Sequence, residues 1–410
     1  MKLFSIFHGV PVLIYHHINY NYGELTPEDF EEQMKYLSDR GYKTLFIDDL
    51  VRLIKEKKTL GKKIVALTFD DGYLDNWVYV YPILKKYKAK ATIFVITSRI
   101  KDKSPSYRFN LEDVWTNRCE WKDLPFIDLS LSVNIKSLLN TDGSLDFVTW
   151  EESSIMEKSG YIDIQSHTHL HSDAFISNEI IDFNRNDPTQ NYFLATGWAT
   201  GGDKRMGIPF YKRASSVAAR IYHDDKRLRD TLADYVSRRP YSLRKKQELN
   251  SLVNDFKKKT NLNDRYESNE ERNSRIIEEL ILSKHIIERK LKKKCSYLCW
   301  PWGEYQDFSI KCAISAGYKG TVTCDPGTNT RKTSLMGIKR IPHSRKLWRF
   351  NLMIFIYSNP ILSEAGILTN RLLSIMRLIA FRLKNKSLTR ALLGELRKRY
   401  RFAGNYLFKK

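Results

Sequence analysis

Apolar and amphipathic segments alternate along the first quarter of the chain. Short runs rich in β-branched and aromatic residues predict strands at residues 10–15, near Thr44, at 64–69 and at 91–96. Segments with apolar positions three or four residues apart predict helices at 27–40, 48–57 and 76–87. This strand and helix repeat favours parallel strands, and a barrel is the natural way to close them.

The middle of the chain is less regular. Residues 101–148 contain many aromatic side chains, and residues 173–270 are polar and charged, with helical patterns at 215–237 and 243–259. We expect the second of these segments to cap the mouth of the barrel. The helix predicted after it has one apolar face, with acids early and lysines late, as the helix dipole prefers. A chain of 410 residues can hold one domain of about 250 residues with large insertions, or two domains.

Two adjacent carboxylates follow the strand predicted at 64–69. They are Asp70 and Asp71, and Gly72 allows the chain to turn sharply after them. In parallel α/β folds, ligands and metals collect at the carboxyl ends of strands. Two neighbouring acids cannot both face an apolar layer, and a cation would offset the energy of burying one of them. Taken alone, however, Asp-Asp-Gly is equally consistent with an ordinary turn.

Three histidines in five positions follow a second predicted strand, at 161–166. They are His167, His169 and His171, and packing alone is a poor explanation for so many imidazoles. Imidazole is a preferred ligand of zinc and similar metals, and a catalytic zinc site uses three protein ligands and leaves one position for water. One of the two aspartates, together with His167 and His171, would provide these three ligands.

These two motifs resemble those of a known family. Thr-Phe-Asp-Asp-Gly at 68–72 and His-Thr-x-x-His at 167–171 are similar to motifs of the polysaccharide deacetylases, the NodB-homology domain of carbohydrate esterase family 4. Weaker matches follow the family's order at 10–18, at Trp-Pro-Trp-Gly 300–303 and at 338–343.

The resemblance covers residues 8–100, 145–175 and 275–345. It implies a distorted (β/α)7-type barrel over residues 8–345, interrupted by insertions at about 101–148 and 173–270. A basic, helical C-terminal tail at 346–410 lies outside it.

The resemblance also assigns roles to the two motifs. Asp70 is expected to be the general base, while Asp71, His167 and His171 bind one divalent metal ion. Zinc is the first choice, with cobalt and nickel as alternatives. The division of roles is physically reasonable, because one carboxylate must bind the metal while the other stays free to take a proton from water.

Two further roles depend on the weaker motifs. The backbone N–H of Trp302 would donate to the oxyanion, and His343 lies where the family often has its general acid. The family's third motif commonly begins with an arginine that braces the catalytic aspartate. Here Cys299 and Trp300 precede Pro301, so the brace must come from elsewhere or be absent.

The implied activity is removal of an N-acetyl or other N-acyl group from an amino sugar, in a polysaccharide or a lipid-linked saccharide precursor. A deformylase or an O-acetyl esterase on the same scaffold is the alternative among enzymes. A catalytically inactive barrel that binds glycan or organises a membrane assembly is the alternative outside them. The intact set of Asp70, Asp71, His167 and His171 argues against an inactive barrel, since binding alone does not need all four.

Charge is distributed unevenly along the chain. The net charge is +22, and residues 345–410 hold 15 Lys and Arg against two acids. The apolar runs in this tail, 352–357 and 372–381, are too short to span a bilayer but suit a helix lying on an anionic membrane surface. A solvated cationic tail, or a helix packed on the barrel, is equally consistent. Nucleic acid is not an expected partner, since no recognised module is present.

The five cysteines show no pairing pattern, which is typical of a reducing compartment. The expected location is therefore the cytoplasm, on the inner face of the membrane if the tail binds there.

Overall fold

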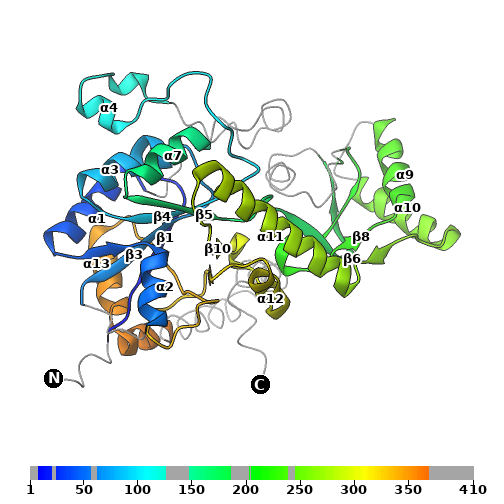
Figure 1. Ribbon diagram of the computed structural model, residues 1–410. Helices are drawn as coiled ribbons and strands as arrows, with labels where there is room; N and C mark the ends of the chain where they lie inside the picture. Colours follow the sequence, from blue (N-terminus) through cyan, green and yellow to red (C-terminus); the bar gives the residue numbers. More distant parts are fainter. Residues whose placement is uncertain are drawn as a thin grey trace, which may run out of the picture.

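A curled sheet of parallel strands forms the centre of the molecule. The computed structural model describes residues 8–20, 25–56, 62–125, 147–185, 203, 205–238 and 245–368. In these residues the main sheet has eight strands in the order β11-β10-β5-β4-β3-β1-β12, with β2 paired to β3 (Figure 1). The strands are β1 (Val12–Tyr15), β2 (Lys43–Leu45), β3 (Ile64–Phe69), β4 (Ala91–Val95), β5 (Ile162–Ser166), β10 (Tyr297–Cys299), β11 (Gly320–Val322) and β12 (Ile341–Pro342).

Backbone hydrogen bonds link the two edges of this sheet. The segment just before β12 forms a parallel bridge to β11, between Val322 and Ile338. Thr323 N–H donates to the carbonyl of Ile338 at 2.9 Å, and Ile338 N–H donates to the carbonyl of Thr321 at 3.0 Å. The predicted distorted barrel of parallel strands is thus confirmed.

Helices cover the outside of the sheet (Figure 1). They are α1 (Pro27–Asp39), α2 (Ile47–Lys55), α3 (Tyr81–Lys86), α7 (Trp150–Lys158), α11 (Asn269–Leu291), α12 (Asp307–Ser315) and α13 (Leu347–Tyr357). Several begin at a local signal in the sequence. At the start of α1, for example, Asp29 N–H donates to the Thr26 hydroxyl and Thr26 N–H donates to the Asp29 carboxylate, each at 3.2 Å. This reciprocal capping satisfies backbone donors that the helix leaves open.

The predicted helix at 76–87 has an unusual first turn. It begins as a five-residue π-helix, Asn76–Val80, before it continues as α3. Asp75, directly before it, is fully buried and accepts from the ring of His17 at 2.8 Å and from the side chain of Asn19 at 3.0 Å. Single π turns are frequent beside functional sites, and this one follows the loop that carries Asp70 and Asp71.

Both faces of the sheet are buried. Along β3, Val65, Leu67 and Phe69 pack in one apolar cluster, while Ala66 packs in a second cluster with Phe94 of β4 and Cys299 of β10. This is the continuous burial expected of parallel strands. Since side chains alternate along a strand, Asp70 points to the same side as Ala66 and Thr68.

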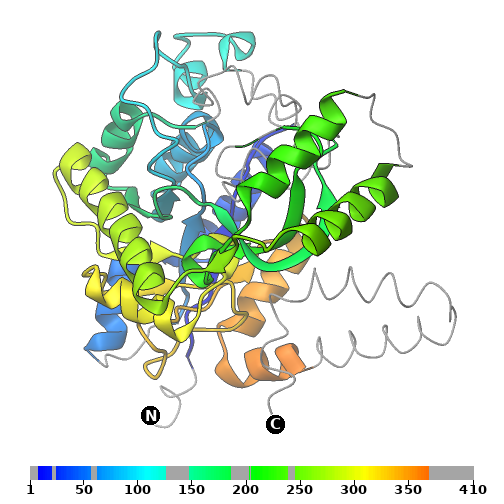
Figure 2. The same ribbon diagram turned by 90° about the vertical axis from the view of Figure 1, so that its right-hand side faces the viewer.

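The described residues of the segment 173–270 form a lobe beside the barrel (Figure 1 and Figure 2). Its helices are α9 (Lys226–Ser237) and α10 (Lys245–Lys259), and its strands form two antiparallel pairs. The strands are β6 (Asp173–Phe183), β7 (Pro209–Ser215), β8 (Tyr222–His223) and β9 (Arg265–Tyr266). The lobe has its own apolar cluster, which includes Phe183, Leu232 and Val253.

The helix predicted at 215–237 is therefore wrong in its first part, because the chain there completes β7 and forms β8 before α9 begins. Ser216 N–H donates to the carbonyl of Ser172 at 2.9 Å, so the base of the lobe lies at the edge of the barrel just after His171. That the lobe caps the barrel mouth stays a prediction.

The described part of the first insertion, 101–125 and 147–148, is joined to the barrel by a buried ion pair. Arg108, which lies before α4 (Leu111–Trp115), donates through Nε to Glu152 of α7 at 2.8 Å. Of the aromatic residues noted in the sequence, Phe109 packs against the main core, whereas Tyr107, Trp115 and Trp121 are exposed. Residues 126–146 lie outside the described part of the chain.

Helix α13 begins the segment predicted as a tail, and it packs on the barrel. Phe350 and Ile354 are fully buried, and the ring of Phe350 lies edge-on to that of Tyr36 in α1, 6.2 Å between centroids. No helix in the described residues is long and apolar enough to cross a membrane. The apolar run 372–381 lies outside the described residues.

We predict that Phe350→Ala lowers the free energy of unfolding by about 3–5 kcal/mol, because it leaves a cavity between α13 and α1. Urea denaturation measures this. The matched control is Phe355→Ala, since Phe355 lies on the same helix but is 64% exposed, and it should change stability by less than about 1 kcal/mol. Equal effects of the two substitutions would contradict the observed packing.

Candidate active site

The chain turns sharply at the end of β3. Asp70 N–H donates to the carbonyl of Tyr15 at 3.0 Å and so extends the strand ladder by one residue. Asp71 and Gly72 then adopt left-handed backbone conformations, with φ of 73° and 78°. A Cβ at Gly72 would lie 2.8 Å from the side chain of Val95, so only glycine fits there. The turn sends the two neighbouring carboxylates into different surroundings.

Arg340 holds the carboxylate of Asp70. Its Nη1 donates to Oδ1 at 2.7 Å and its Nη2 donates to Oδ2 at 2.8 Å, and both side chains are buried. Arg340 is itself positioned by the carbonyl of Thr323 and the hydroxyl of Thr68, at 2.9 and 3.2 Å. Burial alone would raise the pKa of Asp70, but the attraction of Arg340 outweighs it and holds that pKa well below its usual range. An arginine brace is thus present, supplied from the segment just before β12.

Cys299 lies where an arginine commonly begins the family's third motif. Its Sγ is 3.6 and 3.5 Å from the two carboxylate oxygens of Asp70 and 3.0 Å from Nη2 of Arg340. Burial raises the pKa of the Cys299 thiol well above its ordinary value, so the thiol stays protonated at neutral pH and can donate to Asp70.

Asp71, His167 and His171 converge on one point. Oδ1 of Asp71 is 3.4 Å from Nε2 of His167 and 3.6 Å from Nε2 of His171. Tetrahedral coordination at about 2.1 Å places ligand atoms about 3.4 Å apart, so these separations suit a metal ion better than direct hydrogen bonds. Oδ1 of Asp71 is also buried and accepts no hydrogen bond from the described residues. The residues therefore fit a divalent cation.

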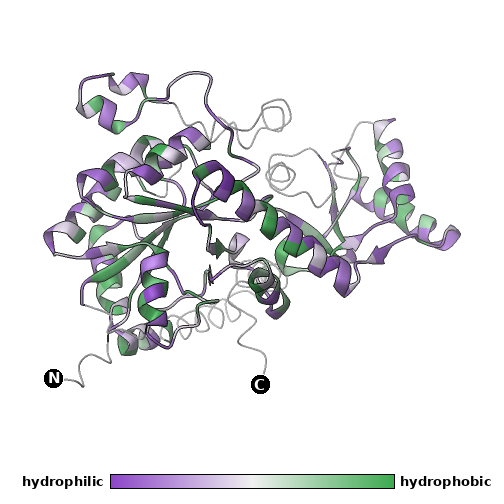
Figure 3. Cartoon of the chain, viewed as in Figure 1, coloured by the Kyte–Doolittle hydropathy of each residue, from purple (hydrophilic) through white to green (hydrophobic). Residues whose placement is uncertain are grey.

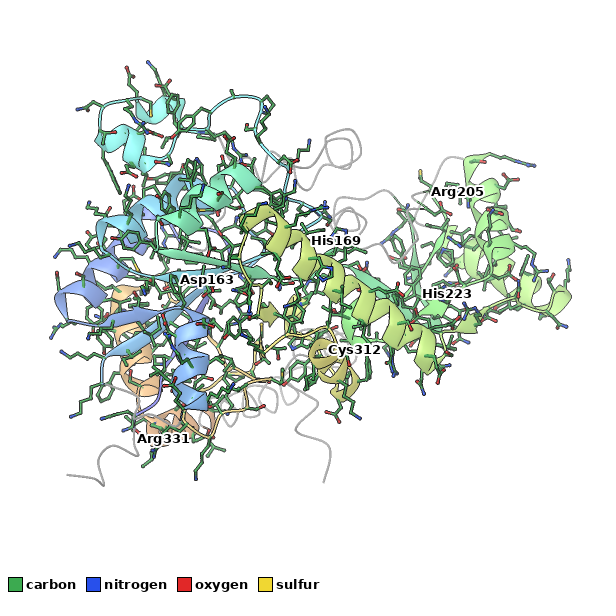
Figure 4. All side chains as sticks on the ribbon, viewed as in Figure 1. Asp163, His169, Arg205, His223, Cys312 and Arg331 are labelled. Carbon is green, nitrogen blue, oxygen red and sulfur yellow. The ribbon has the colours of Figure 1, made fainter. Side chains whose placement is uncertain are left out.

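The surroundings of the two histidines support this arrangement. Nδ1 of His167 lies 2.9 Å from the carbonyl of Cys299, which makes Nδ1 the donor and leaves the Nε2 lone pair directed at Asp71. Burial lowers the pKa of His171 to about 4, so its imidazole is neutral and can act as a ligand at neutral pH. His169, labelled in Figure 4, does not join them, because its Nδ1 contacts the hydroxyl of Thr97 at 2.9 Å.

A second group of potential ligands overlaps the first. Asp70, His167 and Cys299 also lie close enough together to hold a metal. This set is less suitable, since both oxygens of Asp70 already accept from Arg340 and Cys299 is a neutral thiol. The geometry favours Asp71, His167 and His171 as the ligand set.

The two residues from the weaker motifs differ in their distance from this centre. Trp302 has a left-handed backbone, φ 54°, in a short turn, and its ring centroid is 4.4 Å from that of His171. His343 follows β12. Its Nδ1 contacts the carbonyl of Ile14 at 3.0 Å, and its ring stacks on Tyr15 at 4.9 Å. It therefore lies at the same end of the strands as Asp70 but beside β1 rather than among the metal-ligand candidates.

His16 was missed as a site residue by the sequence analysis. Its Nε2 is 3.9 Å from Oδ2 of Asp70, and its side chain is 41% exposed, so it is open to solvent and close to the carboxylate. The signal was its position directly after the first strand. Arg340 was missed too, and no local signal could reveal it, since its partner lies 270 residues away in the sequence.

Comparisons with known proteins match the part of the chain that carries both motifs. The family model described as polysaccharide deacetylase matches residues 57–200, which include both aspartates and all three histidines. Over residues 57–200, about a third of its length, the chain is similar to the polysaccharide deacetylase family. The remaining parts of the site, Cys299 to Gly303 and Arg340, lie outside the matched residues of this deacetylase domain.

Two curated relatives match shorter segments. A putative polysaccharide deacetylase of Bacillus subtilis, YxkH, is 43% identical over 95 residues, which are 23% of this chain and 34% of that protein. Poly-beta-1,6-N-acetyl-D-glucosamine N-deacetylase of Staphylococcus aureus is 36% identical over 82 residues, 20% of this chain and 27% of that protein. The chain thus spans about a third or less of the length of these deacetylases.

A solved structure shares the fold over a longer range. The de-N-acetylase of Aggregatibacter actinomycetemcomitans has a TM-score of 0.50 and 18% identity, and the likeness covers 83% of this chain and 99% of that one. At this identity the likeness shows the fold of the deacetylase barrel alone.

We predict strong coupling between Asp70 and Arg340. Either Arg340→Met or Asp70→Asn leaves a buried charge without its partner and should lower the free energy of unfolding by about 3–5 kcal/mol. The double substitution removes both charges, so it should be clearly less destabilising than the sum of the two single changes. Chemical denaturation of the four proteins measures this coupling. Simple additivity would show that the ion pair contributes nothing specific.

Proposed function

We propose that this protein is a metal-dependent hydrolase that removes an N-acetyl group from an amino sugar in a polysaccharide or a lipid-linked saccharide. The observation that carries the proposal is the buried Oδ1 of Asp71, which lies between two imidazoles and accepts no hydrogen bond from the described residues. Beside it, an arginine holds a second carboxylate apart. The match of residues 57–200 to the polysaccharide deacetylase family model supports the reaction type. Similarity to the poly-beta-1,6-N-acetyl-D-glucosamine N-deacetylase of Staphylococcus aureus supports the amino-sugar substrate.

The ligand set in this proposal is Asp71, His167 and His171. The ion they hold is zinc, with cobalt or nickel as alternatives, and when bound it supplies a Lewis acid for the acyl oxygen and lowers the pKa of water. Thr168 and His171 both have left-handed backbones, with φ of 68° and 48°, and His171 N–H donates to the Thr168 hydroxyl at 3.0 Å. This tight loop fixes the ring of His171 toward Asp71 in advance.

Asp70 is the general base in this proposal. Its low pKa keeps it ionised and thus able to accept a proton, but the same property makes it a weak base that must pass the proton on. His16, 3.9 Å from Asp70, is suited to receive that proton and to deliver it to the leaving amine. The N–H of Trp302, in its left-handed turn beside His171, is the proposed donor to the acyl oxygen.

The proposed roles predict that metal binding and catalysis can be lost separately by substitution. His167→Ala should lose both the metal and the activity, since it removes a ligand. Asp70→Asn combined with Arg340→Met should keep the metal yet lose at least ~10²-fold in rate, because no buried charge is left unpaired but the base is gone. Elemental analysis and acetate release from an N-acetylglucosamine oligomer measure the two properties. Full metal content in His167→Ala, or a wild-type protein that releases no acetate, would overturn the proposal.

The identity of the proton donor is a separate prediction. His16→Gln should lower the rate on the amide substrate by about 10²-fold or more. The loss should be much smaller on an aryl acetate ester, because a phenolate leaves without a proton. The control is His285→Gln, on the exposed surface of α11, which should leave both rates unchanged. If His343→Gln shows the leaving-group dependence and His16→Gln does not, His343 is the acid.

A further inference from the structure

Helix α13 has apolar side chains on two opposite faces. Phe350 and Ile354 are fully buried against the barrel. Trp348, Leu352 and Phe355 are 60%, 48% and 64% exposed. These three residues are four and three positions apart, so they share one side of the helix, here called the outer face of α13. A helix that packs on a soluble barrel by one face ordinarily carries polar residues on the other, so the outer face indicates a second contact.

The apolar surface continues past the end of α13. Ile361, Leu362 and Leu368 are 58%, 38% and 56% exposed. In the part of the chain that the structure describes, six of the sixteen large apolar side chains that are exposed thus lie between residues 348 and 368. In Figure 3, hydrophobic residues, drawn in green, recur along this last described helical region. Scattered exposed apolar residues need no explanation, but a concentration of this kind marks an interaction site.

Cations flank the outer face where α13 begins. They are Arg345, Lys346 and Arg349, and Glu364 is the one acid between residues 345 and 368. The guanidinium of Arg349 lies over the Trp348 ring, 5.2 Å from its centroid. Exposed Trp, Phe and Leu beside Lys and Arg are the combination that lies at the boundary between lipid headgroups and acyl chains.

We propose that the outer face of α13 binds an anionic membrane surface. A second copy of the chain and the chain's own C-terminal residues agree less well with the positive charge beside this face. A two-fold contact between copies would bring the same three cations together. The 42 residues that follow Leu368 carry 12 Lys and Arg against one acid, Glu395, so they would also bring like charge to this face. A surface of anionic lipid complements both the apolar side chains and the cations.

The direction of α13 sets how the barrel would sit on the membrane. Its start lies at the end of the barrel that carries Asp70, here called the catalytic end. There Arg345 pairs with Asp29 at the beginning of α1, and the carbonyl of Ser344 accepts from Gln33 at 2.9 Å. Its end lies at the opposite edge, where the carbonyl of Ser358 accepts from Gly9 N–H, before β1, at 3.0 Å. The helix therefore runs alongside the barrel, antiparallel to β1.

A membrane against this face lies along the side of the barrel, and the catalytic end opens parallel to the membrane plane. Asp70 then faces saccharides close to the lipid headgroups. This orientation, which depends on the proposed function, favours a membrane-borne saccharide over a polymer free in solution.

The test is flotation of the full chain with vesicles made of phosphatidylcholine and phosphatidylglycerol in equal parts. The triple variant Trp348→Gln, Leu352→Gln and Phe355→Gln should bind at least ~10-fold more weakly than wild type. A matched control changes three residues elsewhere that are 52%, 45% and 53% exposed, Trp121→Gln, Leu282→Gln and Ile314→Gln, and it should bind like wild type. Replacing Lys346 and Arg349 by Gln should weaken binding about fivefold for each charge, and added salt should weaken wild-type binding.

Three results would overturn the proposal: a full chain that does not float, equal losses in the two triple variants, or a triple variant that instead converts a dimer to a monomer in sedimentation velocity. Activity on a soluble N-acetylglucosamine oligomer separates this inference from the proposed function. If the protein floats but releases no acetate, the membrane inference stands and the deacetylase proposal is wrong. If the protein releases acetate but does not float, only the membrane inference is wrong.

Discussion

The buried ion pair between Asp70 and Arg340 is the interaction on which the site depends. It joins the end of β3 to the segment that leads into β12, two parts of the chain that are 270 residues apart. A buried carboxylate without a partner would be strongly unfavourable, so the pair couples the closure of the barrel to the position of the proposed base. Cys299 completes this arrangement. Its small neutral thiol leaves room for the guanidinium of Arg340, whereas an arginine at 299 would add a second buried cation.

Left-handed backbone conformations recur around the same centre. Of the residues with positive φ, six lie in the loops that form the site: Asp71, Gly72, Thr168, His171, Trp302 and Gly303. Left-handed conformations of residues other than glycine are unfavourable by about 1–3 kcal/mol each and persist only where the surrounding packing enforces them. The close contact between Gly303 and Cys324, where a Cβ would lie 2.5 Å from the Cys324 Cβ, is one such constraint. The rigid barrel thus supports loops that direct Asp71, His171 and Trp302 toward one point.

The parts of this structure that the sequence predicted are those with local signals. The strand at 64–69 was predicted with the bounds that the structure has, because a continuous apolar run ends at Asp-Asp-Gly. That one of the two aspartates would join His167 and His171 was expected because both motifs follow strands, and ligands collect at the carboxyl ends of parallel strands. The choice of Asp71 came from the family resemblance. The β6 and β7 pair was missed because its strands are far apart in the sequence and mix polar with apolar residues. Arg340 depends on a contact between distant strands, which no local pattern encodes, whereas His16 had a local signal in its position directly after the first strand.

Helix α13 shows how one apolar segment can serve two purposes that the sequence does not separate. The run at 352–357 was interpreted as part of a tail, but Ile354 lies in the core of the barrel while Leu352 and Phe355 face outward. Removing the chain from Lys346 onward would expose the apolar surface of the barrel that Phe350 and Ile354 cover. Loss of membrane binding after such a truncation could then reflect unfolding. Substitution of the outer face alone keeps the inner contacts, so membrane binding and folding become separate measurements.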